Sequence, residues 1–192
     1  MIIENLCDQL MDRLQTIKID PMSILIIGEH SMLREKVLTC YPNAKVYMIH
    51  VDAIENQKQR HDLILSVGGI GFSKFPPKLL FQLLSLLIND KGLLLFCVFL
   101  NGTVDVDQAP LWPCLQSSDQ WIDALVSPWA HPVLDVFSIK VQKLDWIKEL
   151  MACYPVDKTK KMSSIQLETL FGIGWKEAEG TEINIDHITR SY

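Results

Sequence analysis

Three short polar segments are the best candidates for chemistry in this chain. Residues 28–31 (Gly-Glu-His-Ser), 50–52 (His-Val-Asp) and 66–71 (Ser-Val-Gly-Gly-Ile-Gly) each lie at or just beyond the end of an apolar run that is typical of a buried strand. In a sheet of parallel strands, ligands bind beyond the carboxyl ends, where the strand order reverses. The spacing therefore predicts one ligand site at the ends of three strands.

These segments offer groups for binding, whereas the patterns of common catalytic and metal sites are absent from the sequence. The spacing suggests no Ser/His/Asp or Cys/His arrangement, and the HEXXH and P-loop patterns do not occur. The glycines at 68, 69 and 71 match no nucleotide fingerprint, so a loop after a strand is the simpler interpretation. Five cysteines have no metal-ligand spacing: Cys7, Cys40, Cys97, Cys114 and Cys153. We therefore predict no metal site and assign no catalytic residue.

The composition is typical of one globular domain. The chain has 192 residues, a net charge of −5 and a mean hydropathy of +0.16. This length allows a full core, and the charge excludes the basic excess of a nucleic-acid-binding protein. The longest apolar runs, 79–88 and 92–100, are far shorter than the roughly 20 residues of a membrane span. The odd number of cysteines and the lack of a secretory signal predict a cytoplasmic setting.

Hydrophobic periodicity predicts alternating helices and strands. We expect helices at residues 2–17, 32–40, 77–88, 119–126 and 144–151, and strands at 23–28, 45–51, 62–67, 93–100, 133–141 and 165–175. The strand at 45–51 is expected to be buried on both faces, and residues 89–92 to form a turn. Such alternation is typical of an α/β fold with a doubly wound, mostly parallel sheet between helices.

The order of these segments resembles a known enzyme family. RLQTIKIDPMSILIIG (13–28), HDLILSVGGI (61–70) and LETLFGIGWK (167–176), together with residues 40–52, 89–104 and 119–141, are similar to the malonyl-acyl-carrier-protein O-methyltransferase of biotin synthesis and to other class I S-adenosylmethionine-dependent methyltransferases. The resemblance implies a Rossmann-like sheet of order 3-2-1-4-5-7-6 with an antiparallel carboxyl-terminal strand. It also implies one domain over residues 1–192, comprising an amino-terminal helix and linker (1–21), a cofactor-side half (22–110) and a substrate-side half (111–192).

The resemblance assigns the turn after the first strand to the methionine part of S-adenosylmethionine. The family has three glycines in this turn, because the backbone must approach the cofactor closely. This chain has Gly28 followed by Glu29 and His30, and a carboxylate at Glu29 would face the cofactor's own carboxylate. The alternative is that residues 29–31 form only a helix-capping turn. Glu29, His30 and Met32 are also candidates for filling the cleft beyond Gly28.

The other implied cofactor positions lie at the ends of the second and fourth strands of the family. His50 matches the acidic residue that holds the ribose hydroxyls by charge-assisted hydrogen bonds. Asp52 lies two residues further on, so its side chain would point to the same face of an extended strand as that of His50. It could replace the missing acid only if the strand continued to it. The alternative is a structural role for His50. Ser66 and Val67, at the end of the segment that resembles the fourth strand, are the remaining predicted cofactor-binding residues.

The third strand of the family is predicted to be reduced or absent. About ten residues separate Val51 from Asp62, whereas a single parallel crossover needs a dozen or more. This interval would have to hold two crossovers and the strand that brings the adenine-reading side chain. We therefore expect the strand at 45–51 to be an edge strand, which the polar residues 55–60 help to protect. We also expect half of the nucleoside pocket to be missing.

Two surface features predict a partner. The helix at 77–89 has an apolar face wider than a single sheet contact needs, beside a polar stripe of Lys78, Gln82, Ser85 and Asn89. It either packs on the amino-terminal helix and a crossover helix, or binds a partner such as an acyl carrier protein. Four tryptophans belong either to the core or to an interface: Trp112, Trp121, Trp129 and Trp146.

Three functional hypotheses follow from the sequence. The first is a degenerate methyltransferase-like protein that is inactive and retained for binding. The second is an active O-methyltransferase that acts on a carrier-protein-linked acid. The third is a doubly wound binding domain unrelated to methyltransferases, which a carboxyl-terminal segment lying outside the sheet would favour.

Overall fold

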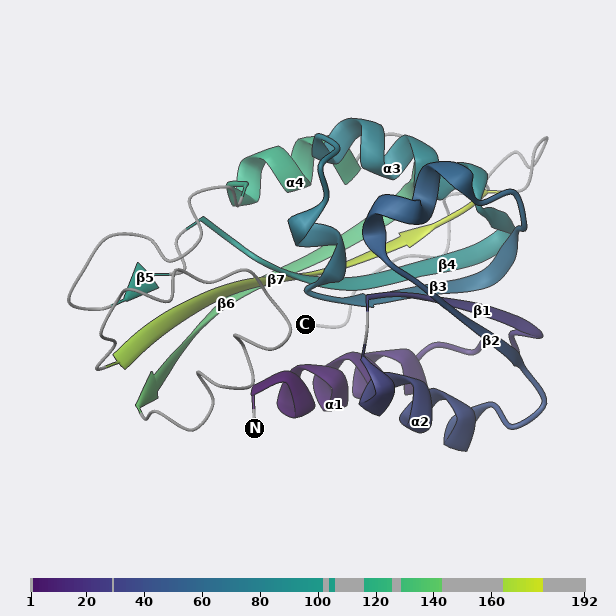
Figure 1. Ribbon diagram of the computed structural model, residues 1–192, viewed down its shortest axis with the longest axis horizontal. Helices are drawn as coiled ribbons and strands as arrows, with labels where there is room; N and C mark the ends of the chain where they lie inside the picture. The colour runs from purple at the N-terminus through teal and green to yellow at the C-terminus, as the bar shows by residue number, and fades with distance from the viewer. Residues whose placement is uncertain are drawn as a thin grey trace, which may run out of the picture.

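One mixed sheet lies between two layers of helices (Figure 1). The computed structural model describes residues 2–28, 30–101, 104–105, 116–125, 129–142 and 164–177. In chain order the elements are α1 (Ile2–Gln15), β1 (Ser23–Ile27), α2 (Ser31–Cys40), β2 (Lys45–Ile49), the 3-10 helix η1 (Val51–Asn56), β3 (His61–Val67), the 3-10 helix η2 (Gly69–Phe72), α3 (Pro77–Leu86), β4 (Ile88–Phe99), β5 (Val104–Asp105), α4 (Ser118–Leu125), β6 (Ala130–Gln142) and β7 (Ser164–Trp175).

The strand order confirms the predicted fold class. Within the described residues the sheet runs β2-β1-β3-β4-β7, and β5 and β6 both pair with β7. The first four of these strands are mutually parallel, whereas β7 is antiparallel to β4 and to β6. The carboxyl-terminal strand is therefore inserted between β4 and β6, as the resemblance implies. This topology contradicts the observation on which the third hypothesis depended.

The core consists of two apolar layers, one on each face of the sheet. Alternate residues of β1 divide between them, because successive side chains of a strand point to opposite faces. Ile24 and Ile26 pack in the layer that contains α1 and α2, and Leu25 and Ile27 pack in the layer that contains α3 and α4. All four side chains are fully buried, which explains the unbroken apolar run of this strand.

The third strand of the family is absent from the chain between β2 and β3, as predicted. The chain after β2 forms only η1 before it enters β3, which pairs with β1 on the side opposite to β2. β2 is therefore an edge strand, as the short interval after Val51 predicts, whereas the expectation that this strand is buried on both faces is wrong. Three of its five residues are exposed, because no neighbouring strand covers its outer side. Glu55, expected to shield this edge, forms an ion pair with Lys74 at 3.0 Å.

The turn predicted at residues 89–92 is instead part of β4. Lys91 adopts a positive φ of 62°, and the register of β3 against β4 shifts nearby, so the strand continues through an irregularity. The reason is pairing with the segment after β7: the Lys91 N–H donates to the Lys176 carbonyl, and the Lys176 N–H donates to Gly92, both at 2.9 Å.

The wide apolar face of α3 packs against other elements on the side of the sheet opposite to α1. α3 packs against α4 and η1, so the predicted contact with the amino-terminal helix is wrong. The polar stripe is also only partly correct, because Ser85 is buried and Asn89 belongs to β4. Trp121 and Trp129 are core residues of this layer, whereas Trp112, Trp146 and the helix expected at 144–151 lie outside the described residues. None of the described helices combines the length and apolar content needed to cross a membrane.

Candidate functional site

The turn after β1 reaches α2 through a glycine with a left-handed backbone. Gly28 has φ of +116°, a conformation that residues with a side chain rarely adopt. Its N–H donates to the Ile49 carbonyl at 2.9 Å, so the turn lies beside the carboxyl end of β2. The structure thus brings together the ends of β1 and β2, as predicted. Glu29 lies outside the described residues.

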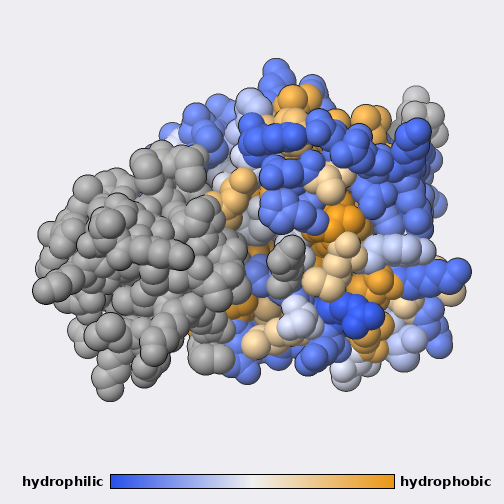
Figure 2. All heavy atoms as spheres, viewed as in Figure 1, coloured by the Kyte–Doolittle hydropathy of each residue, from blue (hydrophilic) through white to orange (hydrophobic). Residues whose placement is uncertain are grey.

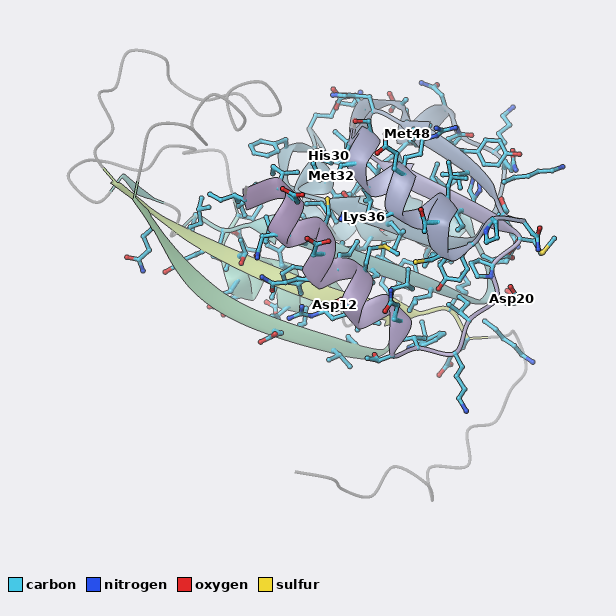
Figure 3. All side chains as sticks on the ribbon, turned by 90° about the horizontal axis from the view of Figure 1, so that it is seen from below. Asp12, Asp20, His30, Met32, Lys36 and Met48 are labelled. Carbon is cyan, nitrogen blue, oxygen red and sulfur yellow. The ribbon has the colours of Figure 1, made fainter. Side chains whose placement is uncertain are left out.

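The His30 ring fills the space next to this turn. Its side chain is 6% exposed, and its Nε2 lies 2.8 Å from the Val67 carbonyl at the end of β3. A Cβ at Gly28 would lie 3.3 Å from Cδ2 of the ring, which shows how closely ring and backbone pack. His30 is the N-cap residue of α2 but makes no side-chain capping bond, so the predicted capping role fails at this residue. In Figure 3, His30 and the half-buried Met32 lie at the same end of α2.

Ser66 joins three segments at the same end of the sheet. Its buried hydroxyl donates to the Ile27 carbonyl at 2.9 Å and accepts the Ile70 N–H at 3.2 Å. Gly69 lies directly against β1, because a Cβ there would fall 2.5 Å from the Ile27 oxygen. Polar groups at the carboxyl ends of β1 and β3 are therefore bound by the protein itself. The signal in the sequence was a lone serine in an apolar strand, since a buried hydroxyl needs partners.

We expect the Ser66→Ala variant to lose about 1–2 kcal/mol of stability, because two buried hydrogen bonds disappear. Urea unfolding followed by circular dichroism measures this loss. Ser73→Ala is a suitable control, since Ser73 is only partly buried and its hydroxyl accepts one local bond, from Phe75 N–H. Equal stabilities of the two variants would contradict the bridging role of Ser66.

His50 and Asp52 form an exposed pair at the start of η1. β2 ends at Ile49, so the condition under which Asp52 would replace the missing acid is not met. Asp52 lies in the first turn of η1, and its N–H donates to Nδ1 of His50 at 3.3 Å. The two side chains are 59% and 50% exposed. His50 is the N-cap residue of η1, and its side chain accepts the Asp52 N–H.

The turn at Gly28 is closely packed by the protein's own residues. The His30 ring occupies the side of the turn that a glycine-rich loop would leave open, and the strand that would carry the adenine-reading side chain is missing. Two pockets lined by described residues do not include Gly28. One, of about 230 Å³, lies between α1 and α2, and the other, of about 420 Å³, lies between α3 and α4. Among the described residues, no His, Cys, Asp or Glu cluster could hold a metal ion.

A second polar cluster, which the sequence did not reveal, joins the opposite ends of the strands. The Asp62 carboxylate accepts the N–H groups of Met22 and Ser23 at 2.9 and 3.0 Å, and the Asn89 amide at 2.7 Å. The adjacent His61 is 1% exposed, with Nδ1 2.8 Å from the Ser23 hydroxyl. Burial lowers the pKa of His61 below its ordinary value of 6.5, although the Asp62 carboxylate opposes this shift.

Acid should destabilise the protein through His61. Its folded pKa is depressed, so the unfolded chain binds a proton below about pH 6.5 that the folded chain refuses. Stability is therefore complete above that pH and decreases as the pH falls towards the folded pKa. Urea unfolding at a series of pH values from 8 to 5 should give a smaller decrease for His61→Asn, which cannot titrate. Parallel decreases in the two proteins would exclude His61 as the cause.

The comparisons with known proteins find similarity in structure only. No protein-family model and no curated protein matches the chain. A proposed methyltransferase of Bacillus halodurans superposes with a TM-score of 0.62 at 10% identity, over 90% of this chain and 99% of that one. The YcgJ protein of Bacillus subtilis gives 0.55 at 10% identity, over 89% and 99% of the two chains. The plantazolicin methyltransferase BpumL, in complex with a pentazolic desmethylPZN analogue and S-adenosylhomocysteine, gives 0.55 at 13% identity, over 92% and 84%.

At these identities the similarity shows the fold alone. The chain has the fold of the class I S-adenosylmethionine-dependent methyltransferases, with the strand order described above.

Proposed function

We propose that this protein uses a methyltransferase fold for binding and does not transfer methyl groups from S-adenosylmethionine. The observation that supports this most directly is the closure of the strand ends where the cofactor would lie. His30 bonds to the Val67 carbonyl, and Ser66 bonds to the Ile27 carbonyl and the Ile70 N–H. A cofactor would have to displace buried hydrogen bonds, each of which contributes about 1 kcal/mol or more.

The absence of the third strand supports the same proposal. Productive methyl transfer depends mainly on holding the two reactants in one orientation. The chain between β2 and β3 provides only η1, whose Asp52 is engaged with His50 on the surface. A nucleoside held on one side only would be poorly oriented, even if the His30 ring moved.

We place the binding surface on the outer side of α3, and an acyl carrier protein is the partner that the family resemblance suggests. Leu79 and Leu86 are 43% and 62% exposed and lie two turns apart on the helix. The pocket between α3 and α4 is adjacent, and it includes Lys78 and Gln120. Two exposed leucines beside a pocket with polar groups at its border offer the apolar contact and polar rim that protein interfaces use.

Two measurements on the full chain test this function. Incubation with labelled S-adenosylmethionine and malonyl-acyl-carrier protein should yield no methyl ester above the blank. Titration with the carrier protein should show binding that Leu86→Glu weakens about tenfold, since a buried charge without a partner opposes binding. Val133→Glu is the matched control, because Val133 is 57% exposed on β6 and has the same parity as Asp135, which contacts Arg13 of α1 on the face opposite to α3. Ester formation would contradict inactivity, and equal affinities of the two variants would exclude α3.

The second candidate is an active O-methyltransferase of the biotin-pathway type. It is supported by the sequence resemblance over residues 13–176 and by structural neighbours such as BpumL, whose structure contains S-adenosylhomocysteine. It requires the His30 ring to leave the turn. Methyl ester formation in the assay above would establish this activity.

A further inference from the structure

Because only η1 lies between β2 and β3, the described sheet ends at β2 with an open edge. β2 pairs with β1 alone among the described residues. This edge faces the viewer in Figure 1, and Figure 2 shows hydrophobic residues among hydrophilic ones on the same face. Tyr47 and Met48 are each 36% exposed on this strand. Figure 3 shows Met48 at the outer margin of the sheet.

The backbone of β2 directs a regular set of hydrogen-bonding groups outward. The Lys45 N–H donates to the Met22 carbonyl, and the Ile49 carbonyl accepts the Gly28 N–H, both at 2.9 Å. These bonds fix the alternation, so Lys45, Tyr47 and Ile49 direct their backbone groups towards β1. Val46 and Met48 therefore direct their N–H and C=O groups towards the open edge.

We propose that β2 pairs with β2 of a second copy of this chain, antiparallel and with the two-fold axis at Tyr47. In this register Val46 lies opposite the partner's Met48, and each such pair exchanges two hydrogen bonds. The two-fold axis generates the same pair again, so four main-chain bonds join the copies. The two sheets become one continuous sheet, and the contact is self-complementary, as a two-fold interface requires.

The side chains suit this register on both faces of the strand. Tyr47 lies beside the partner's Tyr47, in a pair whose backbone groups point away and whose side chains are therefore close. Met48 faces the partner's Val46 on the other face, so both contacts are apolar. No charged residue lies opposite a like charge, which would oppose pairing.

Charge complementarity favours the antiparallel orientation. Lys45 is exposed at the start of β2, whereas Asp52 is half exposed in η1 just beyond its end. Antiparallel pairing brings Lys45 of each copy towards the partner's Asp52, twice per dimer. A parallel arrangement would instead place Lys45 near the partner's Lys45. An exposed lysine on an edge strand usually opposes pairing with another strand. In the antiparallel register Lys45 instead lies towards an acidic residue.

Register-specific cross-linking of the full chain tests the proposal. In a Cys40→Ser background, which removes an exposed thiol, Tyr47→Cys should form a disulfide-linked dimer under mild oxidation. Met48→Cys is the matched control, since it lies opposite the partner's Val46 and not opposite itself. Equal cross-linking of the two variants would overturn the register, and so would its absence in both.

Sedimentation velocity at tens of micromolar protein tests the charge contact without introducing a cysteine. The native chain should be a dimer, and Lys45→Glu should weaken it about tenfold by placing like charges together. Adding Asp52→Lys to the Lys45→Glu variant should restore the dimer, because the two charges are then opposite again. If Lys45→Glu weakened the dimer only by destabilising the fold, the second substitution would not restore it. A monomeric native chain, or a dimer indifferent to both changes, would overturn the proposal.

Discussion

Replacing Phe96 with alanine is expected to lower the free energy of unfolding by about 3–5 kcal/mol, the usual cost of removing a buried aromatic ring. Phe96 is fully buried in the middle of β4. Its ring centroid lies 5.3 Å from that of Phe81 on α3 and 6.2 Å from that of Trp121 on α4. The ring therefore joins the sheet to both helices that cover this face.

Urea unfolding by fluorescence and circular dichroism measures the loss. Phe96→Leu retains most of the volume and should cost about 1.5 kcal/mol or less. A loss for Phe96→Ala below that of Phe96→Leu would show that α3 and α4 do not depend on this ring.

Replacing Gly69 with alanine is expected to cost about 2–3 kcal/mol, near the upper end of the range for overpacking. The added Cβ would fall 2.5 Å from the Ile27 carbonyl oxygen and 3.1 Å from the Ser66 hydroxyl oxygen. The first contact is backbone at the end of β1, so the strand or η2 must move. The hydrogen bonds that close this end of the sheet would weaken together.

Gly71→Ala is the matched control for this substitution. Gly71 lies two residues further along the same 3-10 helix, and its added Cβ would meet the Val98 side chain at an ordinary 3.5 Å. We expect its stability to stay within about 0.5 kcal/mol of the native chain, or to rise, because alanine restricts the unfolded state. Similar losses for both variants would contradict the close packing of η2 on β1.

Much of the fold could be predicted from the sequence because its strands are buried on both faces. Continuous apolar runs identify β1, β3 and β4, and the short interval after Val51 predicts the missing third strand. Periodicity does not identify neighbours, however: the apolar run of β2 predicted a buried strand, although the short interval after it correctly predicted an edge. Its sequence is as apolar as an inner strand, but its exposure depends on the strand that is absent beside it.

The sequence could bring three strand ends together, but it could not give the contacts made there. The ends of β1, β2 and β3 do lie together, as the strand order requires. The roles of His30 and Ser66 depend on distances to main-chain carbonyls of other strands, at Val67 and Ile27, which no sequence pattern reports. The end of β2 at Ile49 likewise depends on where η1 begins, and it removes Asp52 from the predicted position.

The most direct test of the closed strand ends is a calorimetric titration of the native chain with S-adenosylhomocysteine. An active methyltransferase titrated in the same buffer serves as the positive control. With His30 and Ser66 bonded to the strand ends and no third strand beside β2, we expect no heat beyond dilution even at millimolar ligand. Saturable binding with a micromolar dissociation constant would show that these groups yield to the cofactor, and would contradict the closed site.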